Sequence, residues 1–164
     1  NYMKILGIDP GFGRLGYAII ETTGGKTAVI DCSCFETDAK TEYHKRLLAV
    51  AEKIKKLIIK HEPDAVAVEK IFFTQNKKTA FQIAEIRGII IYLAVSFKIP
   101  VFEYTPLEVK MALCGYGKAD KNQVGKMLGL ILGLKSLPRQ DDASDALAIS
   151  LTCANSISSK MAIK

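Results

Sequence analysis

The sequence lacks internal repeats, low-complexity tracts and linker-like stretches, which argues against an array of modules. Its 164 residues suit one domain, and we expect residues 1–164 to form it. Residues 1–2 precede Met3 and are interpreted as left over from expression. Residues 156–164 are polar and basic without a pattern, so this tail is expected to fray.

No stretch predicts a membrane span. The longest apolar run, Gly88–Phe97, is about half of the length that a span needs. No basic and apolar leader opens the chain, so there is no sign of secretion. We therefore expect a cytoplasmic protein without a membrane partner.

Cysteine and histidine are sparse, which argues against a zinc site. Neither His44 nor His61 has a recognisable ligand spacing relative to the cysteines. The four cysteines are interpreted as buried structural thiols in a reducing cytosol; they are Cys32, Cys34, Cys114 and Cys153. Cys32 and Cys34 are two apart in a strand-like stretch, so their side chains should face the same way.

Three well-known catalytic motifs are also missing. The chain contains no GxSxG, no Walker loop and no HExxH. Its net charge of +6 and pI near 9.1 are compatible with a polyanionic partner. Because moderately basic domains are common, charge alone favours such a partner only slightly.

The hydrophobic pattern predicts a mixed α/β domain. The first three strands should form an antiparallel meander: Met3–Asp9, Gly16–Thr22 and Lys26–Thr37. Helices are expected over Glu42–His61, over Lys77–Phe97, from Pro106, from a capping box at Asp120 to about Leu132, and over about Asp141–Asn155. Strands Asp64–Glu69 and Pro100–Tyr104 lie between helices and should pair in parallel through right-handed crossovers. The expected fold is a mixed sheet with helices on both faces.

Acidic residues fall at the ends of these predicted elements. Asp9 ends the first strand, and Glu69 ends the strand that follows the first helix. If the two strands pair in parallel, both acids emerge at the same edge, where ligands of open α/β sheets bind. On the last helix, Asp142 and Asp145 share a face, and so would Asp141 and Asp145.

Each acid also has an ordinary structural interpretation. Asp9 before Pro10 suits a turn, Glu69 suits a solvated strand end, and acids commonly cap a helix start. Asp145 is harder to explain, because it adjoins an apolar stripe where an unpaired carboxylate is costly. Together the acids favour a cation site, and a set of oxygen ligands suits Mg²⁺. Two such ions about 3.5–4 Å apart can promote phosphodiester cleavage.

Four motifs occur in an order that resembles one family. They are G-I-D-P-G at 7–11, V-E-K-I-F-F at 68–73, V-F-E-Y at 101–104 and D-x-x-D-A-L-A at 142–148. Together they resemble the bacterial RuvC-type Holliday junction resolvases of the ribonuclease H-like superfamily. The similarity extends from Met3 to about Cys153, which is nearly the whole chain.

The resemblance implies the identity of the site. The family's catalytic, metal-binding acids fall on Asp9, Glu69, Asp142 and Asp145, and the D-A-L-A tail fixes the helix register and leaves Asp141 one residue early. The implied cofactor is Mg²⁺, or Mn²⁺ in its place, with two ions per site. The implied protein is a bacterial homodimer that nicks a four-way junction symmetrically in recombination and repair, with a branch-migration helicase as a further partner. Two-fold symmetry in the enzyme would match two-fold symmetry in the junction.

The resemblance also suggests DNA contacts. Phe72 matches an aromatic residue that stacks on bases, an interaction worth roughly 1–3 kcal/mol per base. Lys110 and Lys121 match basic residues near the scissile phosphate. Lys118, Lys77 and Lys78 are further candidates. The plain alternative is a core phenylalanine and solvated lysines.

The helix over Lys77–Phe97 is apolar almost all round after Ile86, which is typical of a core helix or of one half buried in a partner. The resemblance favours a dimer interface at its N-terminal half.

Three other functions are compatible with parts of the pattern. They are another ribonuclease H-like nuclease such as an RNA–DNA hybrid hydrolase, a branched-DNA binder without catalysis, and an ATPase of the sugar-kinase or actin type. A pure binder has no reason to direct four carboxylates at phosphates. The ATPase type needs two such domains around a nucleotide, and the chain is too short for them.

Overall fold

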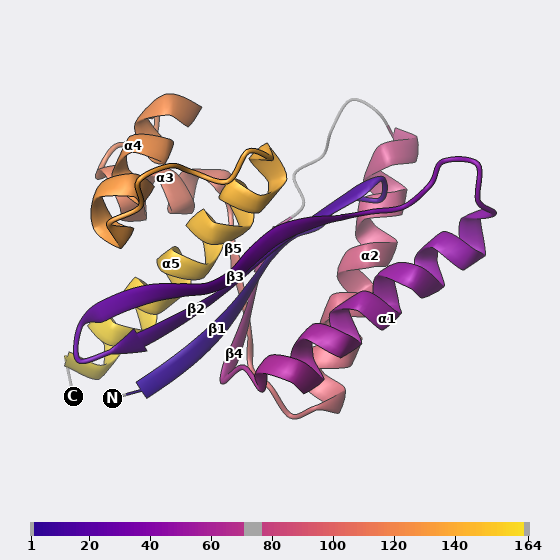
Figure 1. Cartoon of the computed structure of the whole chain (residues 1–164), viewed down its shortest axis with the longest axis horizontal. Coiled ribbons are helices and arrows are strands. Elements are labelled where there is room, and N and C mark those ends of the chain that lie inside the picture. Colours follow the sequence, from indigo (N-terminus) through magenta and orange to yellow (C-terminus); the bar gives the residue numbers. More distant parts are fainter. Residues whose placement is uncertain (1, 71–76, 163–164) are drawn as a thin grey trace.

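A five-stranded mixed sheet forms the centre of the molecule (Figure 1). The structure is a computed structural model that describes residues 2–70 and 77–162, without the side chains of residues 77 and 160–162. The strands are β1 (Tyr2–Asp9), β2 (Arg14–Thr23), β3 (Lys26–Glu36), β4 (Ala65–Glu69) and β5 (Val101–Tyr104). Their order is β3-β2-β1-β4-β5, antiparallel from β3 to β1 and parallel from β1 to β5. The predicted meander and parallel strands are confirmed.

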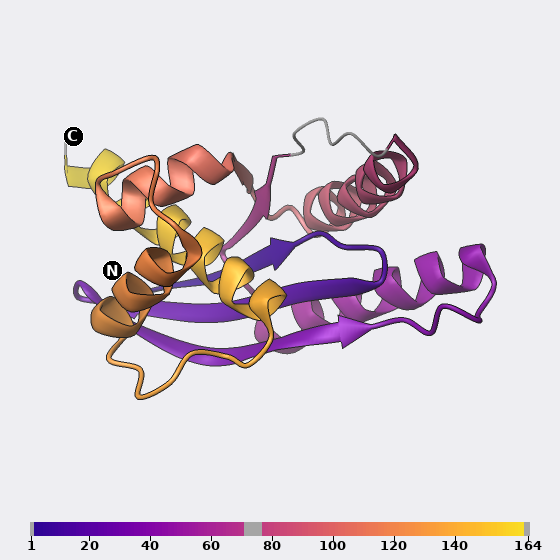
Figure 2. The same cartoon turned by 90° about the horizontal axis from the view of Figure 1, so that it is seen from above.

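Helices cover both faces of this sheet, as predicted. They are α1 (Tyr43–His61), α2 (Lys77–Ser96), α3 (Pro106–Cys114), α4 (Lys121–Leu132) and α5 (Asp141–Ala162). Helices α1 and α2 lie on one face and α3, α4 and α5 on the other (Figures 1 and 2). Strand alternation divides the apolar side chains between two cores: Ile5 packs in the core on the α5 side, and its neighbour Leu6 packs in the core beneath α1 and α2.

Local sequence signals fix several helix ends. Asp120 caps α4 with Gln123 in a reciprocal capping box, as predicted, and Thr105 and Glu108 form a second one at the start of α3. Helix α1 ends at His61 and is capped by Glu62, which adopts a left-handed conformation with φ 47° before Pro63. These caps hold the ends of the helices without tertiary contacts.

The last helix is longer than predicted. It was expected to end at about Asn155 and continues to Ala162. Two contacts explain the difference. The hydroxyl groups of Ser156 and Tyr104 lie 2.6 Å apart, and Ile157 packs against the core on the α5 side.

Helix α2 is apolar on two opposite sides. Contrary to the sequence analysis, its segment Lys78–Ser96 is long and apolar enough to cross a membrane by length and composition, and 17% of the apolar window is buried. One side buries Ile86, Ile90 and Ala94 in the core shared with α1. An ion pair between Arg87 and Glu103 also ties α2 to β5. These contacts hold α2 against the sheet as a layer of an α/β domain.

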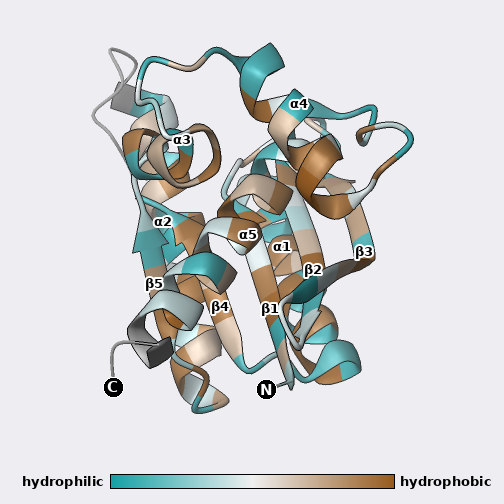
Figure 3. Cartoon of the chain, turned by 90° about the vertical axis from the view of Figure 1, so that its left-hand side faces the viewer, coloured by the Kyte–Doolittle hydropathy of each residue, from teal (hydrophilic) through white to brown (hydrophobic). Residues whose placement is uncertain are grey.

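Helix α5 lies directly on the sheet because two glycines leave room for it (Figure 3). A Cβ atom on Gly7 would lie 2.4 Å from the carbonyl oxygen of Ala146, and one on Gly16 would lie 2.0 Å from that of Asp142. Both distances are far below contact distance, so a side chain at either position would push α5 away. The glycines therefore set the height of the first turns of α5 above β1 and β2.

Replacing Gly16 with alanine should destabilise the protein. The methyl group would collide with the backbone of α5, and overpacking of this kind costs about 1–3 kcal/mol. We expect a fall of several degrees in the thermal midpoint, since 1 kcal/mol corresponds to about 2–4 °C in a domain of this size. Gly13→Ala is the control, because a Cβ there meets nothing within 4 Å. Equal midpoints for the two variants would contradict the close approach.

Candidate active site

Asp9 and Glu69 lie side by side at one edge of the sheet. Strands β1 and β4 are parallel, and their last paired residues are Ile8 and Val68. The two acids come next on each strand and face α5, as Gly7 and Ala67 do two residues earlier. The prediction that both acids emerge at the same edge is confirmed.

The start of α5 brings two further acids to this edge. The backbone of Asp142 lies over Gly16, and Gly16 is paired with Asp9 across β1 and β2. Asp142, Asp145 and Glu69 all raise the pKa of Asp9 by their charge, so the four carboxylates form one electrostatic cluster. Asp141 is 81% exposed and is not among the charges that raise the pKa of Asp9. The geometry therefore groups Asp142, rather than Asp141, with the strand acids.

The cluster is electrostatically unfavourable without a cation. Burial, followed by repulsion from the other three acids, raises the pKa of Asp9 from 3.8 to about 8. The pKa of Glu69 and that of Asp145 are also raised, in both cases mainly by burial. Such shifts are typical of functional sites, because folding alone gives no reason to gather like charges.

Lys121 partly compensates this charge from the start of α4. Its Nζ lies 3.6 Å from Oδ2 of Asp145 and 3.5 Å from Oδ2 of Asp141. The charge of Asp145 is the main cause that raises the pKa of Lys121. The lysine predicted near the scissile phosphate thus contacts the cluster.

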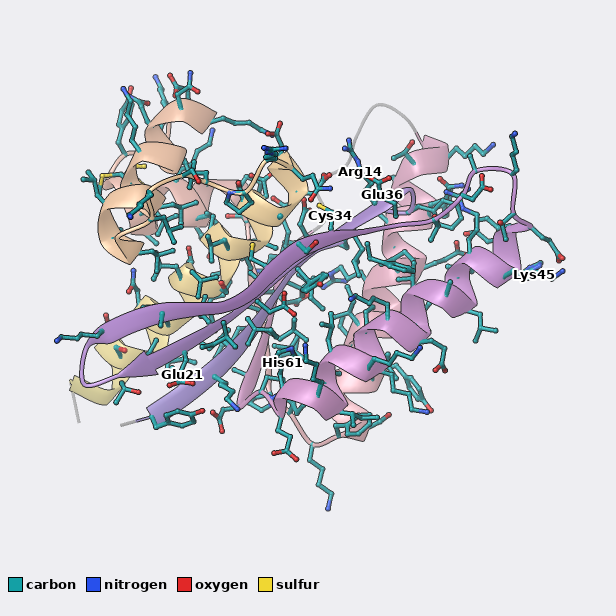
Figure 4. All side chains as sticks on the ribbon, viewed as in Figure 1. Arg14, Glu21, Cys34, Glu36, Lys45 and His61 are labelled. Carbon is teal, nitrogen blue, oxygen red and sulfur yellow. The ribbon has the colours of Figure 1, made fainter. Side chains whose placement is uncertain are left out.

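A second cation, Arg14, was missed by sequence reasoning. Its Nε lies 3.2 Å from Oδ2 of Asp142, and the Cys34 thiol is 4.0 Å from the same oxygen. Figure 4 shows Arg14 and Cys34 close together beside the start of α5. Burial, followed by the charge of Asp142, raises the pKa of Cys34 and favours the neutral thiol. The available signal was a basic residue at the start of β2, close in sequence to Asp9, but only the fold shows which acid it contacts.

A cavity of about 850 Å³ opens beside the cluster, between α3, α4 and α5. Glu69 and Asp145 line one side, and Lys110, Lys121 and Lys126 contribute positive charge. The predicted Lys110 therefore shares a cavity with two of the acids. This arrangement suits an anionic chain that reaches the carboxylates past lysines.

The remaining predicted DNA contacts lie elsewhere. Lys118 is exposed in the loop before α4, and Lys78 is exposed on the first turn of α2; neither lines the cavity. Phe72 and the side chain of Lys77 lie outside the described residues. No disulfide joins the four cysteines, all of which lie in the described part of the chain; Cys153 is buried and the other three are half-buried.

The donor set fits a hard divalent cation. The cluster offers carboxylate oxygens only, and positive charge would relieve the repulsion that raises the pKa of Asp9. Within residues 2–70 and 77–162, however, no three acidic, histidine or cysteine side chains are spaced to hold one ion as they stand.

Comparison with known proteins agrees with the motifs. The family model for the crossover junction endodeoxyribonuclease RuvC matches residues 5–153. The chain is 43% identical over 155 residues to the RuvC of Desulfitobacterium hafniense, covering 94% of each protein. It is 46% identical over 149 residues to that of Syntrophomonas wolfei, covering 91% of this chain and 87% of the relative. The chain belongs to the RuvC family.

A solved structure supports the same assignment. Thermus thermophilus RuvC in complex with a Holliday junction substrate superposes with a TM-score of 0.90 at 33% identity, covering 94% of each chain. The ribonuclease H-like fold implied by the motifs is therefore confirmed. Membership of the family makes the chain a nuclease, and nucleases of this family depend on divalent metal ions.

The shifted pKa of Asp9 predicts how stability depends on pH without metal. The folded protein keeps a proton on Asp9 up to about pH 8, whereas the unfolded chain releases it near pH 4. Stability should therefore fall as the pH rises from about 4 to about 8. Asp9→Asn removes this loss, so in EDTA the variant should melt higher than the wild type at pH 8 and at nearly the same temperature at pH 4.

Thermal unfolding across this pH range is the measurement. Asp141→Asn is the matched control, because Asp141 is exposed and the variant should follow the wild type. Equal midpoints of Asp9→Asn and the wild type at pH 8 would show that Asp9 is not destabilised by its neighbours.

Proposed function

We propose that this protein resolves Holliday junctions by paired, symmetric phosphodiester cleavage in homologous recombination and repair. The observation that carries the proposal is the convergence of Asp9, Glu69, Asp142 and Asp145 beside a lysine-lined cavity. The substrate is inferred from the similarity to Thermus thermophilus RuvC, whose complex contains a Holliday junction. We place the enzyme in the bacterial cytoplasm, with a branch-migration helicase as a partner.

The four carboxylates are the metal ligands in this proposal, with Mg²⁺ or Mn²⁺ as the ion and two ions per site. Bound ions would supply charge stabilisation at the attacking and leaving oxygens of the phosphodiester. The chain's own residues position the strand. Lys110 and Lys121 bind phosphates at the mouth of the cavity. The carboxyl end of β1 holds Asp9 in a buried position.

We further propose a homodimer built on α2. Its outward side carries a stripe of exposed residues at helical spacing: Phe81, Ala84, Gly88, Tyr92 and Val95. Phe81, Tyr92 and Val95 are exposed by 73%, 70% and 62%, which is unusual for large apolar side chains on one helix face. Small residues between aromatic ones let two copies of the helix approach closely about a two-fold axis. Two active sites related in this way match two symmetric nicks.

Conservative substitution of the acids tests the catalytic cluster. We expect Asp142→Asn to lower the cleavage rate of a mobile four-way junction in Mg²⁺ by at least about 100-fold, because it removes a proposed carboxylate ligand of the ions that stabilise charge on the reacting phosphate. Asp141→Asn differs by one position and keeps all four acids of the cluster, so it should cleave at close to the wild-type rate.

The same assay separates the alternative substrates. An RNA–DNA hybrid should be cleaved much more slowly than the junction by the wild type. Preference for the hybrid would overturn the junction assignment, and unchanged cleavage by Asp142→Asn would overturn the role of that carboxylate.

Charge on the α2 stripe should separate the subunits. Tyr92→Asp places a carboxylate within the proposed interface, and burying an unpaired charge is costly. We expect sedimentation equilibrium to show a dimer for the wild type and a mainly monomeric variant. Leu130→Asp is the control, since Leu130 is 77% exposed on α4, on the opposite face of the sheet. A wild-type monomer, or dissociation by Leu130→Asp alone, would exclude α2 as the interface.

A further inference from the structure

Two cations hold the acidic cluster from different sides of α5. Lys121 contacts Asp145 and Asp141 from the side of α4. Arg14 contacts Asp142 from the side of β2 and β3, where Cys34 faces the same carboxylate oxygen. Of the two cluster acids on α5, Asp145 is therefore paired with Lys121 and Asp142 with Arg14. Lys121 matches a known basic position of the family, whereas the role of Arg14 follows from this geometry alone.

The ion pair of Arg14 contributes little to stability. The arginine side chain is 56% exposed and that of Asp142 is 28% exposed, and exposed ion pairs add little to stability. Arg14 has no other carboxylate partner among the described residues. A long cationic side chain that is solvated on one side and directed at a metal ligand on the other is better explained by binding than by folding.

The guanidinium group can still bind a phosphate in this position. Its Nε faces Asp142, and the remaining N–H groups form a planar fork that suits a phosphate group. A DNA strand lying across the four acids would pass Lys121 on one side and Arg14 on the other. The two cations would then contact phosphates on either side of the scissile one.

Metal binding and this ion pair use the same carboxylate. As the structure stands, no three described acids are spaced to hold one ion, and Arg14 occupies one oxygen of Asp142. A divalent ion that recruits Asp142 competes with Arg14 for it and is repelled by its charge. We propose that Arg14 is a phosphate-binding residue of the nuclease site, paired with Asp142 until a divalent ion takes that carboxylate and frees the guanidinium for DNA. The proposal rests on the proposed function as a junction-resolving nuclease.

The first test measures metal binding without DNA. Mn²⁺ is titrated calorimetrically into the wild type, Arg14→Gln and Arg14→Lys. We expect Arg14→Gln to bind Mn²⁺ about tenfold more tightly, the effect of removing one unit charge about 6 Å from a divalent ion in a water-like dielectric. Arg14→Lys keeps the charge and should stay close to the wild type. Weaker Mn²⁺ binding by Arg14→Gln would show instead that Arg14 positions Asp142 for the metal, and unchanged binding would exclude competition.

The second test measures binding of a four-way junction. In Ca²⁺, with strand integrity checked by gel, Arg14→Gln should bind more weakly, and the slope of log affinity against log salt should fall by about one. In EDTA the difference from the wild type should be smaller, because Asp142 then holds Arg14. Lys45→Gln is the matched control: it removes one exposed charge on α1, far from the cluster (Figure 4).

The second test decides whether Arg14 contacts a phosphate of the DNA. An unchanged salt slope for Arg14→Gln, an equal loss in Ca²⁺ and EDTA, or an equal loss in Lys45→Gln would overturn it. If the wild type does not prefer the junction to a linear duplex, the proposed substrate is wrong, whereas the Mn²⁺ result still tests the pairing of Arg14 with Asp142. The two failures are thus distinguishable.

Discussion

The direct contact between α5 and the sheet is the constraint on which the site depends. Gly7 and Gly16 provide no side chains, and backbone atoms of α5 occupy the space that a Cβ atom would need. This contact brings Asp142 beside the end of β1, where Asp9 and Glu69 already lie. Larger residues at the two glycine positions would bury more apolar surface, but they would lift α5 and separate its acids from those of the strands. The sheet therefore lacks side-chain packing at these two positions, and the four carboxylates lie near one another.

This clustering of four carboxylates is locally unfavourable, and the rest of the fold must offset it. Burial and like charge raise the pKa of Asp9 to about 8, so the metal-free protein is less stable than an uncharged site would make it. Proteins commonly accept such losses where activity requires them. Here the conflict is limited by Lys121 and Arg14, which lie at the rim and leave the space between the acids open to a cation.

Sequence reasoning predicted the parts of the fold and site that follow from local pattern and strand order. Strand alternation and a parallel β1–β4 pair were enough to place Asp9 and Glu69 together. The choice of Asp142 over Asp141 required the rotation of α5, which the family motif supplied and which spacing alone left open. Arg14 was missed because an arginine in a glycine-rich turn has no pattern until β2 is placed against β3 and α5. The length of α5 was misjudged because Tyr104 and the core, both far away in sequence, hold its last turns.

The acidic cluster and the proposed dimer interface lie on opposite faces of the sheet. The acids, the cavity and both rim cations belong to the α3–α5 face, whereas the exposed apolar stripe belongs to α2 on the other face. In the proposed dimer, pairing through α2 would leave both clusters open to DNA. Helix α2 packs on the sheet through Ile86 and Ile90, and Arg87 on α2 pairs with Glu103 on β5, so the proposed interface and the site belong to one packed unit. A two-fold axis at α2 would therefore fix the separation of the two clusters, and a junction is cut symmetrically only if that separation matches the distance between its two scissile phosphates.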